Sequence, residues 1–249
     1  MRTLTKLTWV EAKLFVREPT TVVFTFAFPL LVLFVMGGVF GNTPDPDGAV
    51  FRGVGPLNYY VPAYIGLVIS SIGLISLPVH LAAYRERGVL RRLRASSVSV
   101  WGLLGSQVIV SIAIAALGSL LLIIAAGIVY DMRLPGWSAW QVAAAFLLGT
   151  LSFASVGVLL GAVLPTARSA QGAGLLLFFA MMMLSGAGPP REVMTQAMVR
   201  MGDVMPLTYV IESLQDPWLG FAWNPVPFGI VLAVMVAAAT LSVRAFRWE

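Results

Sequence analysis

The chain has 249 residues, of which 59% are hydrophobic and only 11% are charged, and it contains no cysteine and one histidine. A soluble domain of this length carries roughly a quarter charged residues, so this composition excludes a water-soluble globular fold. The missing cysteines exclude disulfides and thiolate metal sites. The net charge of +5 is too unevenly distributed along the chain to indicate nucleic acid as a partner.

Residues 1–19 predict an amphipathic helix that lies along the membrane surface. At about 100° per residue, four basic side chains fall within an arc of about 60°. These are Arg2, Lys6, Lys13 and Arg17. Most of the opposite side is apolar, although Glu11 lies within it. Such a helix buries its apolar side among lipid headgroups, and Pro19 ends it.

Six long uncharged runs predict an all-α integral membrane protein with about six transmembrane helices. Each run reaches the ~20 residues that cross ~30 Å of hydrocarbon. The predicted spans lie near residues 20–40, 59–80, 103–128, 140–163, 171–188 and 226–244. The fifth span is the weakest because glycines and prolines at 186–190 cut it short, and a segment that dips back into the membrane is the alternative there.

The loop after the second span, residues 84–100, has a helical composition at its start. Arg87, Arg91 and Arg94 follow i, i+4, i+7 spacing and therefore share one face. Leu90 and Leu93 form a short apolar edge that suits burial by a second protein. The alternative is a basic loop that only fixes the orientation of the spans.

Neutral polar and soft side chains within the spans are the candidates for a translocation path. They are Ser70, Ser71, Gln107, Ser111, Met181 and Met182. Hydrogen bonds between helices are the commoner role of such hydroxyls and amides. Two G-x-x-x-G patterns, at 37–41 and 157–161, are compatible with a dimer face.

Residues 189–224 predict an extracellular re-entrant or interfacial region with short helices before the last span. Met194, Met198 and Met201 repeat at i, i+4, i+7, as in an interfacial helix with one apolar face. Pro206 breaks this helix, and residues 207–214 form a second short one.

The charge distribution predicts the orientation of the spans. If both termini share a side with the loops after spans two and four, that side holds twelve of the 16 basic residues, and the other side holds seven of the 11 acidic ones. Cytoplasmic loops are the basic ones. We therefore expect both termini in the cytoplasm, in a multi-pass protein of the plasma or inner membrane.

Several kinds of chemistry have no residues to support them. The only lysines, Lys6 and Lys13, do not follow the glycines of a phosphate-binding loop. One histidine, His80, supplies neither a metalloprotease motif nor a His-pair metal site. We expect no enzyme activity, no cofactor in this chain and no ionisable relay within the spans, so that transport must take its energy from another subunit.

Three motifs, in this order, resemble the ABC-2 family of membrane permeases, of the type found in daunorubicin-resistance exporters. The first is W-x-E-x-x-x-F-x-R-x-P from Trp9 to Pro19, followed by F-P-L at 28–30. The second is the Tyr84–Ser96 loop, which resembles E-R-E-x-G-T-L-R-x-L-R-A-T with a later Trp, here Trp101. The third is P-L-T-Y-x-x-E-x-L from Pro206 to Leu214. The departures are Val89, Ser96, Ser97 and Val100, where the family often has Thr, Thr, Pro and Pro.

The resemblance implies that the 84–94 loop is a coupling helix that docks on a separate ATPase subunit, with the N-terminal helix packed beside it. The coupling residues would be Tyr84, Arg85, Glu86, Arg87, Gly88, Leu90, Arg91, Leu93 and Arg94. We expect Glu86 and the three arginines of the basic face to make the polar contacts and the two leucines to be buried. In the N-terminal helix, the motif residues are Trp9, Glu11, Lys13, Phe15 and Arg17.

The resemblance also implies partners and a transport function. The expected assembly is a single permease domain, residues 1–249, paired with a second copy or a paralogue in contact with membrane lipid and with two ATPase chains that hold ATP and Mg²⁺. The favoured cargo is an apolar or amphiphilic compound, as in multidrug export and antibiotic resistance. A polysaccharide or lipid-linked glycan exporter is one alternative, and an ATP-independent channel or scaffold is another.

Overall fold

The computed structural model describes residues 2–44, 47–89, 100–130 and 132–245, and every regular element in these ranges is helical. Six stretches are long and apolar enough to cross a membrane, which confirms the predicted fold class. They are Pro19–Phe40 (α2, a π-helical turn and α3), Pro56–Glu86 (α4, a π-helical turn and α5), α7 (Val100–Tyr130, of which the span is Gly102–Tyr130), α8 (Ala139–Val163), α9 (Ala167–Leu184) and α12 (Pro225–Ala245). The chain is a multi-pass membrane protein.

Two spans differ from their predicted bounds. The second runs for 31 residues and ends at Glu86, so the first residues of the predicted coupling loop form the last turn of a membrane helix. The fifth, α9, is an uninterrupted helix of 18 residues, which favours a crossing helix over a segment that dips back. It begins at Ala167 because Thr166 caps it, accepting a hydrogen bond from the backbone N–H of Ser169 at 3.1 Å.

The second span is the central helix of the bundle. In its most apolar window 89% of the residues are buried, against 22% in the first and last spans. It packs against α3, α7, α8, α9 and α11, so the first, third, fourth and fifth spans all contact it. A displacement of this helix therefore reaches almost every other element.

Glycines allow the close packing around the second span. A Cβ atom on Gly157 of α8 would clash with the backbone of Gly73, and one on Gly174 of α9 would clash with the backbone of Leu74. Gly161 lies against Leu81 in the same way. The G-x-x-x-G pattern at 157–161 therefore packs inside the chain rather than at a dimer face.

The first two spans each contain one π-helical turn, Val23–Ala27 and Ile72–Ser76. Each lies just before a proline, Pro29 or Pro78. A proline lacks the backbone N–H, and its ring clashes with the carbonyl four residues earlier, so the wider turn accommodates it. The two irregular turns are tied together because the hydroxyls of Thr25 and Ser71, the residue before the second turn, lie 3.0 Å apart in a buried hydrogen bond.

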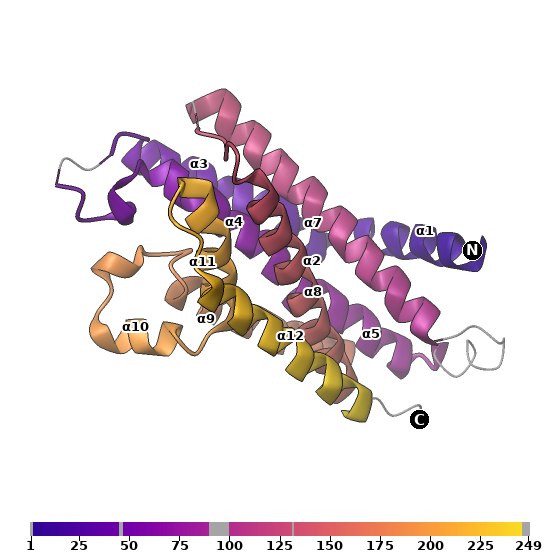
Figure 1. Ribbon diagram of the computed structural model, residues 1–249. Helices are drawn as coiled ribbons and strands as arrows, with labels where there is room; N and C mark the ends of the chain where they lie inside the picture. The colour runs from indigo at the N-terminus through magenta and orange to yellow at the C-terminus, as the bar shows by residue number, and fades with distance from the viewer. Residues whose placement is uncertain (1, 45–46, 90–99, 131, 246–249) are drawn as a thin grey trace.

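We call the end of the bundle where α1 (Arg2–Val16) lies the inner end and the opposite end the outer end. The outer end carries short helices, as predicted for the region before the last span (Figure 1). They are Arg191–Val193, α10 (Gln196–Gly202) and α11 (Pro206–Leu219). A further short turn, Phe51–Gly53, lies at the same end of the bundle. The predicted methionine stripe is wrong in part. Met194 lies before α10, whose first residue is Gln196, and Met201 is 55% exposed.

Candidate functional site

Tyr84, at the end of the second span, is tied to the N-terminal helix. Its hydroxyl donates a hydrogen bond to Oε1 of Glu11 at 2.9 Å, across 73 residues of sequence. Glu11 is only 6% exposed, and burial raises the pKa of its carboxyl group, although the nearby Tyr84 and Gln107 side chains lower it in part. The predicted proximity of the N-terminal helix to the 84–94 loop thus rests on a specific buried contact.

Arg85, the next residue, caps the inner end of α8. Its Nη1 donates to the carbonyl oxygens of Gly161 at 2.9 Å and Ala162 at 2.5 Å, with Leu164 at 3.4 Å. The last carbonyls of a helix have no partner within the helix, and the negative end of the helix dipole attracts a cation. The guanidinium group therefore satisfies both the hydrogen bonding and the charge of this helix end.

Glu86, the third residue in the row, contacts the start of α9. Its Oε2 accepts a hydrogen bond from the backbone N–H of Ala167, the first residue of that helix, at 3.1 Å. The positive end of the helix dipole, at the N-terminus, attracts a carboxylate, just as the negative end, at the C-terminus, attracts an arginine. Tyr84, Arg85 and Glu86, which we call the inner hub, thus bind three different elements: α1, the end of α8 and the start of α9.

The inner hub leads directly into the predicted docking loop. Arg87 is exposed, and Gly88 has a positive φ of +65°, a conformation that suits glycine and ends α5. The other predicted docking residues, Leu90, Arg91, Leu93 and Arg94, lie outside the described residues. Glu86 was expected to face a partner, and the structure gives one of its oxygens a bond within the chain, while the side chain stays exposed.

The N-terminal helix turns one side into the bundle and the other outward. Glu11 and Phe15 are buried, and the Phe15 ring packs edge-on against Phe26 of the first span. Trp9 is 63% exposed, and the ammonium group of Lys13 lies 5.1 Å from the centre of its ring. Arg17 is exposed as well. An exposed tryptophan beside a lysine is typical of a helix at a membrane interface.

A small polar cavity lies between the N-terminal helix and the second and third spans. Its volume of about 20 Å³ is roughly that needed for one water molecule. Its polar lining consists of Glu11, Ser76, His80, Gln107 and Ser111. His80, the last residue of the predicted second span, is an ionisable side chain in this lining, and its helix continues to Glu86. The expectation that the spans hold no ionisable relay stays a prediction.

The six predicted path residues separate into three places. Gln107 and Ser111 line the small polar cavity. Ser70 and Ser71 are buried in the second span and donate to the carbonyls of Leu67 and Val68. Met181 and Met182 are buried in α9. Within one chain they do not share a channel, and their part in transport stays a prediction.

An aromatic cluster between the first span and α9 was not predicted. The ring centres of Phe24, Phe28, Phe178 and Phe179 lie 5.5 to 5.8 Å apart in neighbouring pairs, most of them edge to face. Phe178 is fully buried, whereas Phe179 is 38% exposed. The spacing Phe24–Phe28 at i, i+4 and the Phe178–Phe179 pair were the available signals, but nothing in the sequence shows that the two helices meet.

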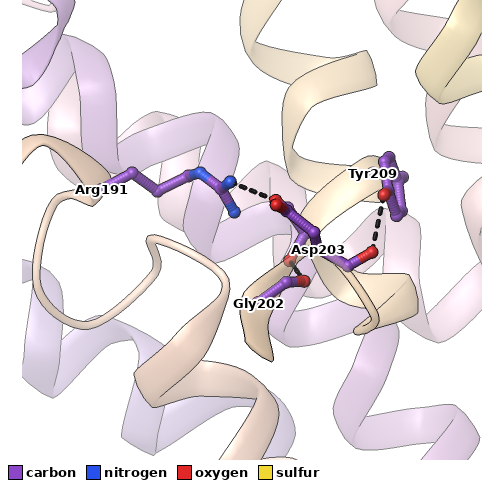
Figure 2. A network of polar contacts seen from close by, with 5 residues as sticks. Arg191, Gly202, Asp203 and Tyr209 are labelled. Carbon is purple, nitrogen blue, oxygen red and sulfur yellow. Dashed lines mark hydrogen bonds and ion pairs between the residues drawn. The ribbon is translucent and has the colours of Figure 1, made fainter. Parts of the chain in front are cut away.

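The outer end of the bundle carries its own polar network, shown in Figure 2. A terminal nitrogen of Arg191 lies 2.5 Å from a carboxylate oxygen of Asp203, whose carbonyl accepts from the Tyr209 hydroxyl at 2.6 Å. The Thr208 hydroxyl donates to the carbonyl of Gly202 at 2.6 Å. Together these bonds hold α10 and the start of α11 against the segment after α9.

Beside this network lies a charged cavity of about 490 Å³, lined by Arg52, Glu192, Glu212 and Asp216 among others. Arg52 pairs with Asp216 at 2.8 Å and has a positive φ of +56°, which is unfavourable for a residue other than glycine. Burial, above all, raises the pKa of Glu212. Among the described residues, no group of three His, Asp or Glu side chains is placed to hold a metal ion.

Comparison with known proteins bears on these observations. A family model described as "ABC-2 type transporter" matches residues 2–219, which include α1, the first five spans and the outer helices up to the end of α11. No curated protein matches the chain.

Proposed function

Since this chain belongs to the ABC-2 type transporter family, whose members are membrane permease components of ABC transporters, we propose that it forms the translocation path of an exporter for apolar or amphiphilic compounds. Separate ATPase subunits supply the energy through the 84–94 loop. The observation that carries this proposal is the inner hub, where three consecutive residues bind three different elements.

The inner hub supports a mechanical route from a docked partner to the membrane helices. A push on the loop first reaches residues 84–86, which end the central helix of the bundle. From there the displacement is transmitted to α1 through Tyr84, to α8 through Arg85 and to α9 through Glu86. Hydrogen bonds to helix ends are short and directional, so these helices move with the loop instead of sliding past it.

The nature of the cargo follows from the lining available to it. The aromatic cluster joins the first span and α9, and its exposed parts are Phe179 and the half-buried Phe24 and Phe28. No charged side chain lies between residues 169 and 190. Such a surface suits an apolar or amphiphilic molecule of the drug or lipid type. The exposure of these two spans, with 22% and 28% of their windows buried, supports pairing with a second permease across this face.

The proposed orientation puts the inner hub and both termini in the cytoplasm. Among the described residues, most basic ones lie at the end of the bundle where α1 and the inner hub lie, and most acidic ones lie at the end with α10 and α11. The polar end of Arg87 is exposed on the first side. This is the side from which a soluble ATPase approaches.

The absence of cysteine from the chain makes a direct test simple. Arg87→Cys and Arg133→Cys each introduce one thiol at an exposed position, and the two positions lie at opposite ends of the bundle. In intact cells a membrane-impermeant maleimide should label Arg133→Cys but label Arg87→Cys only after permeabilisation. A bifunctional crosslinker should join Arg87→Cys, and not Arg133→Cys, to the co-expressed ATPase.

Two results would contradict the proposal. One is labelling of Arg87→Cys from outside the cell, and the other is crosslinking of the ATPase at Arg133→Cys alone. A compound panel assayed in proteoliposomes, with and without ATPase, then separates the drug-type exporter from the glycan exporter, because only the first moves small amphiphiles. Transport that does not depend on the ATPase would indicate a channel instead.

A further inference from the structure

An apolar groove of about 440 Å³ lies between the third and fourth spans near the outer end of the bundle. Its size is within the range of small-molecule sites. Residues from α7 and α8, with Ile65 of the central helix, form its walls, and Trp218 of α11 closes it at one side. The main apolar lining residues are Ile65, Leu120, Ile123, Leu134, Ala143 and Phe146.

Two polar groups of residues that line this groove are buried and have no hydrogen-bond partner among the described residues. They are the indole Nε1 of Trp218 and the hydroxyl of Ser119, and each side chain is only 6% exposed. Other hydroxyls in the spans donate to their own helix, as Thr150 does to Phe146 and Ser155 to Leu151. A buried polar group without a partner costs free energy, so an occupant that pairs with these groups is favoured.

The chemistry of the two groups restricts the occupant. An indole N–H only donates, so the occupant must offer an acceptor at Trp218. The rest of the groove is apolar, so the remainder of the occupant must be apolar as well. Trp218 is held in position because the Ser138 hydroxyl donates to the carbonyl of Pro217, next to it in α11, at 2.5 Å.

A second cavity meets the groove at the same tryptophan. It has a volume of about 510 Å³ and is more polar than the groove, with Asn42, Asn58 and Arg133 in its lining together with Trp218. One wall residue thus separates an apolar compartment from a polar one. An amphiphile with an acceptor between its apolar chain and its polar head matches this sequence of surfaces.

We propose that the groove between α7 and α8 binds a phospholipid of the adjacent leaflet, with one acyl chain against the apolar walls and its ester carbonyl accepting a hydrogen bond from Trp218 Nε1. The hydroxyl of Ser119, which also lines the groove, is a second unpartnered group. The exposed residues Leu120 and Ala143 of two membrane-spanning helices line the groove, so a lipid enters from the side. The groove and the aromatic cluster lie on different spans, so the site is separate from the proposed export path.

The test uses native mass spectrometry of the purified chain in detergent, with either phosphatidylethanolamine or its diether analogue added. The diether lipid lacks the ester carbonyl, and it should therefore bind roughly fivefold more weakly than the diester, the value of about one hydrogen bond. Trp218→Phe should weaken diester binding by about the same factor and remove the difference between the two lipids. Trp223→Phe, a change to a half-exposed tryptophan at the same end of the bundle, should leave the difference intact.

A second pair of variants tests the groove without the hydrogen bond. Ala143→Phe places a ring in the groove and should reduce binding of both lipids by at least about tenfold, because the ring occupies the space that the acyl chain would fill. Ala237→Phe places the same ring on the exposed side of α12 and should have no effect. Equal binding of diester and diether lipid by the unsubstituted chain would overturn the proposal. So would full lipid binding by an Ala143→Phe protein that unfolds at the same temperature as Ala237→Phe.

Discussion

Two polar networks of this bundle, the inner hub and the network of Figure 2, connect the chain in different ways. The bonds of the inner hub join residues that lie 73 to 81 positions apart in sequence, whereas the outer network of Figure 2 joins residues only 6 to 12 positions apart. The bonds of the inner hub therefore connect separate helices, and those of Figure 2 stabilise one local cap. Other contacts at the outer end, such as the Arg52–Asp216 pair, join distant elements and are not part of this network. The inner hub transmits a displacement, and the network of Figure 2 resists one.

Removal of Arg85 should have the largest effect on this contrast. Arg85→Ala leaves the carbonyls of Gly161 and Ala162 without their charged donor, which costs about 3 kcal/mol of unfolding free energy. Thermal unfolding in lipid nanodiscs measures the loss. Arg133→Ala, at the other end of the bundle, is the control and should change stability by less than about 0.5 kcal/mol. Equal losses in the two variants would remove the proposed role of Arg85 as a helix cap.

A second substitution tests the packing of α8 against the central helix at a point farther from the inner hub. Gly157→Ala places a methyl group against the backbone of Gly73 in the central helix, and we expect it to cost about 2 kcal/mol through overpacking. Gly127→Ala in α7 meets no atom within 4 Å and should be neutral or stabilise the helix by up to about 1 kcal/mol. Thermal unfolding of the two variants should therefore shift in opposite directions or, at the least, differ clearly. A stable Gly157→Ala protein would show that α8 and the central helix are less tightly packed than described.

Loss of the Tyr84 hydroxyl should have a smaller effect that depends on pH. Tyr84→Phe removes one bond to Glu11 and should cost about 1 kcal/mol at neutral pH. Burial raises the pKa of Glu11 above its ordinary value of 4.5, so the folded chain holds this proton more tightly than the unfolded chain. The stability that protonated Glu11 contributes is fully present below about pH 4.5. It is lost as the pH rises through the pKa of Glu11 in the folded chain.

The hydroxyl of Tyr84 favours the ionised form of Glu11, so its removal raises the pKa of Glu11 further. The cost of Tyr84→Phe should therefore be small in acid and grow toward neutral pH, and unfolding temperatures measured across this range would show it. Glu11→Gln should abolish this pH dependence. A cost that is the same at every pH would mean that Glu11 is not the partner that matters.

The smallest effect is expected at the outer end. Arg191→Ala breaks the pair with Asp203, in which the Arg191 and Asp203 side chains are 23% and 50% exposed. Ion pairs this accessible to water contribute at most about 1 kcal/mol, and salt weakens them. Unfolding of this variant in low and high salt should differ little from that of the parent chain. A loss as large as that of Arg85→Ala would show that the outer network also joins distant elements.

The six spans were predictable because uncharged runs of sufficient length have no other stable environment. The end of the second span was not, since Arg85 and Glu86 read as loop residues. They extend the helix because the ends of α8 and α9 satisfy their charges. Those partners are backbone atoms, and the sequence does not show which backbone atoms lie near a given side chain. The small cavity beside His80 escaped prediction because it forms only where α1 packs against the second and third spans.

The prolines are an intermediate case, because the sequence indicates the local irregularity of each helix but not how the two helices pack. A proline disturbs the helix around it, and the π-helical turns lie just before Pro29 and Pro78. That the two turns lie side by side, joined through Thr25 and Ser71, depends on the packing of two helices. The unpartnered groups of Trp218 and Ser119 likewise belong to the assembled bundle.

The most direct measurement of the central claim is the number of substrate molecules exported per ATP hydrolysed. It compares the parent chain with the triple variant Tyr84→Phe, Arg85→Gln, Glu86→Gln, each reconstituted with the ATPase in proteoliposomes. If the inner hub connects the docking loop to α1, α8 and α9, ATP hydrolysis should continue while this ratio falls at least about tenfold, which corresponds to about 1.4 kcal/mol of coupling. An unchanged ratio in a stable, assembled triple variant would contradict the account.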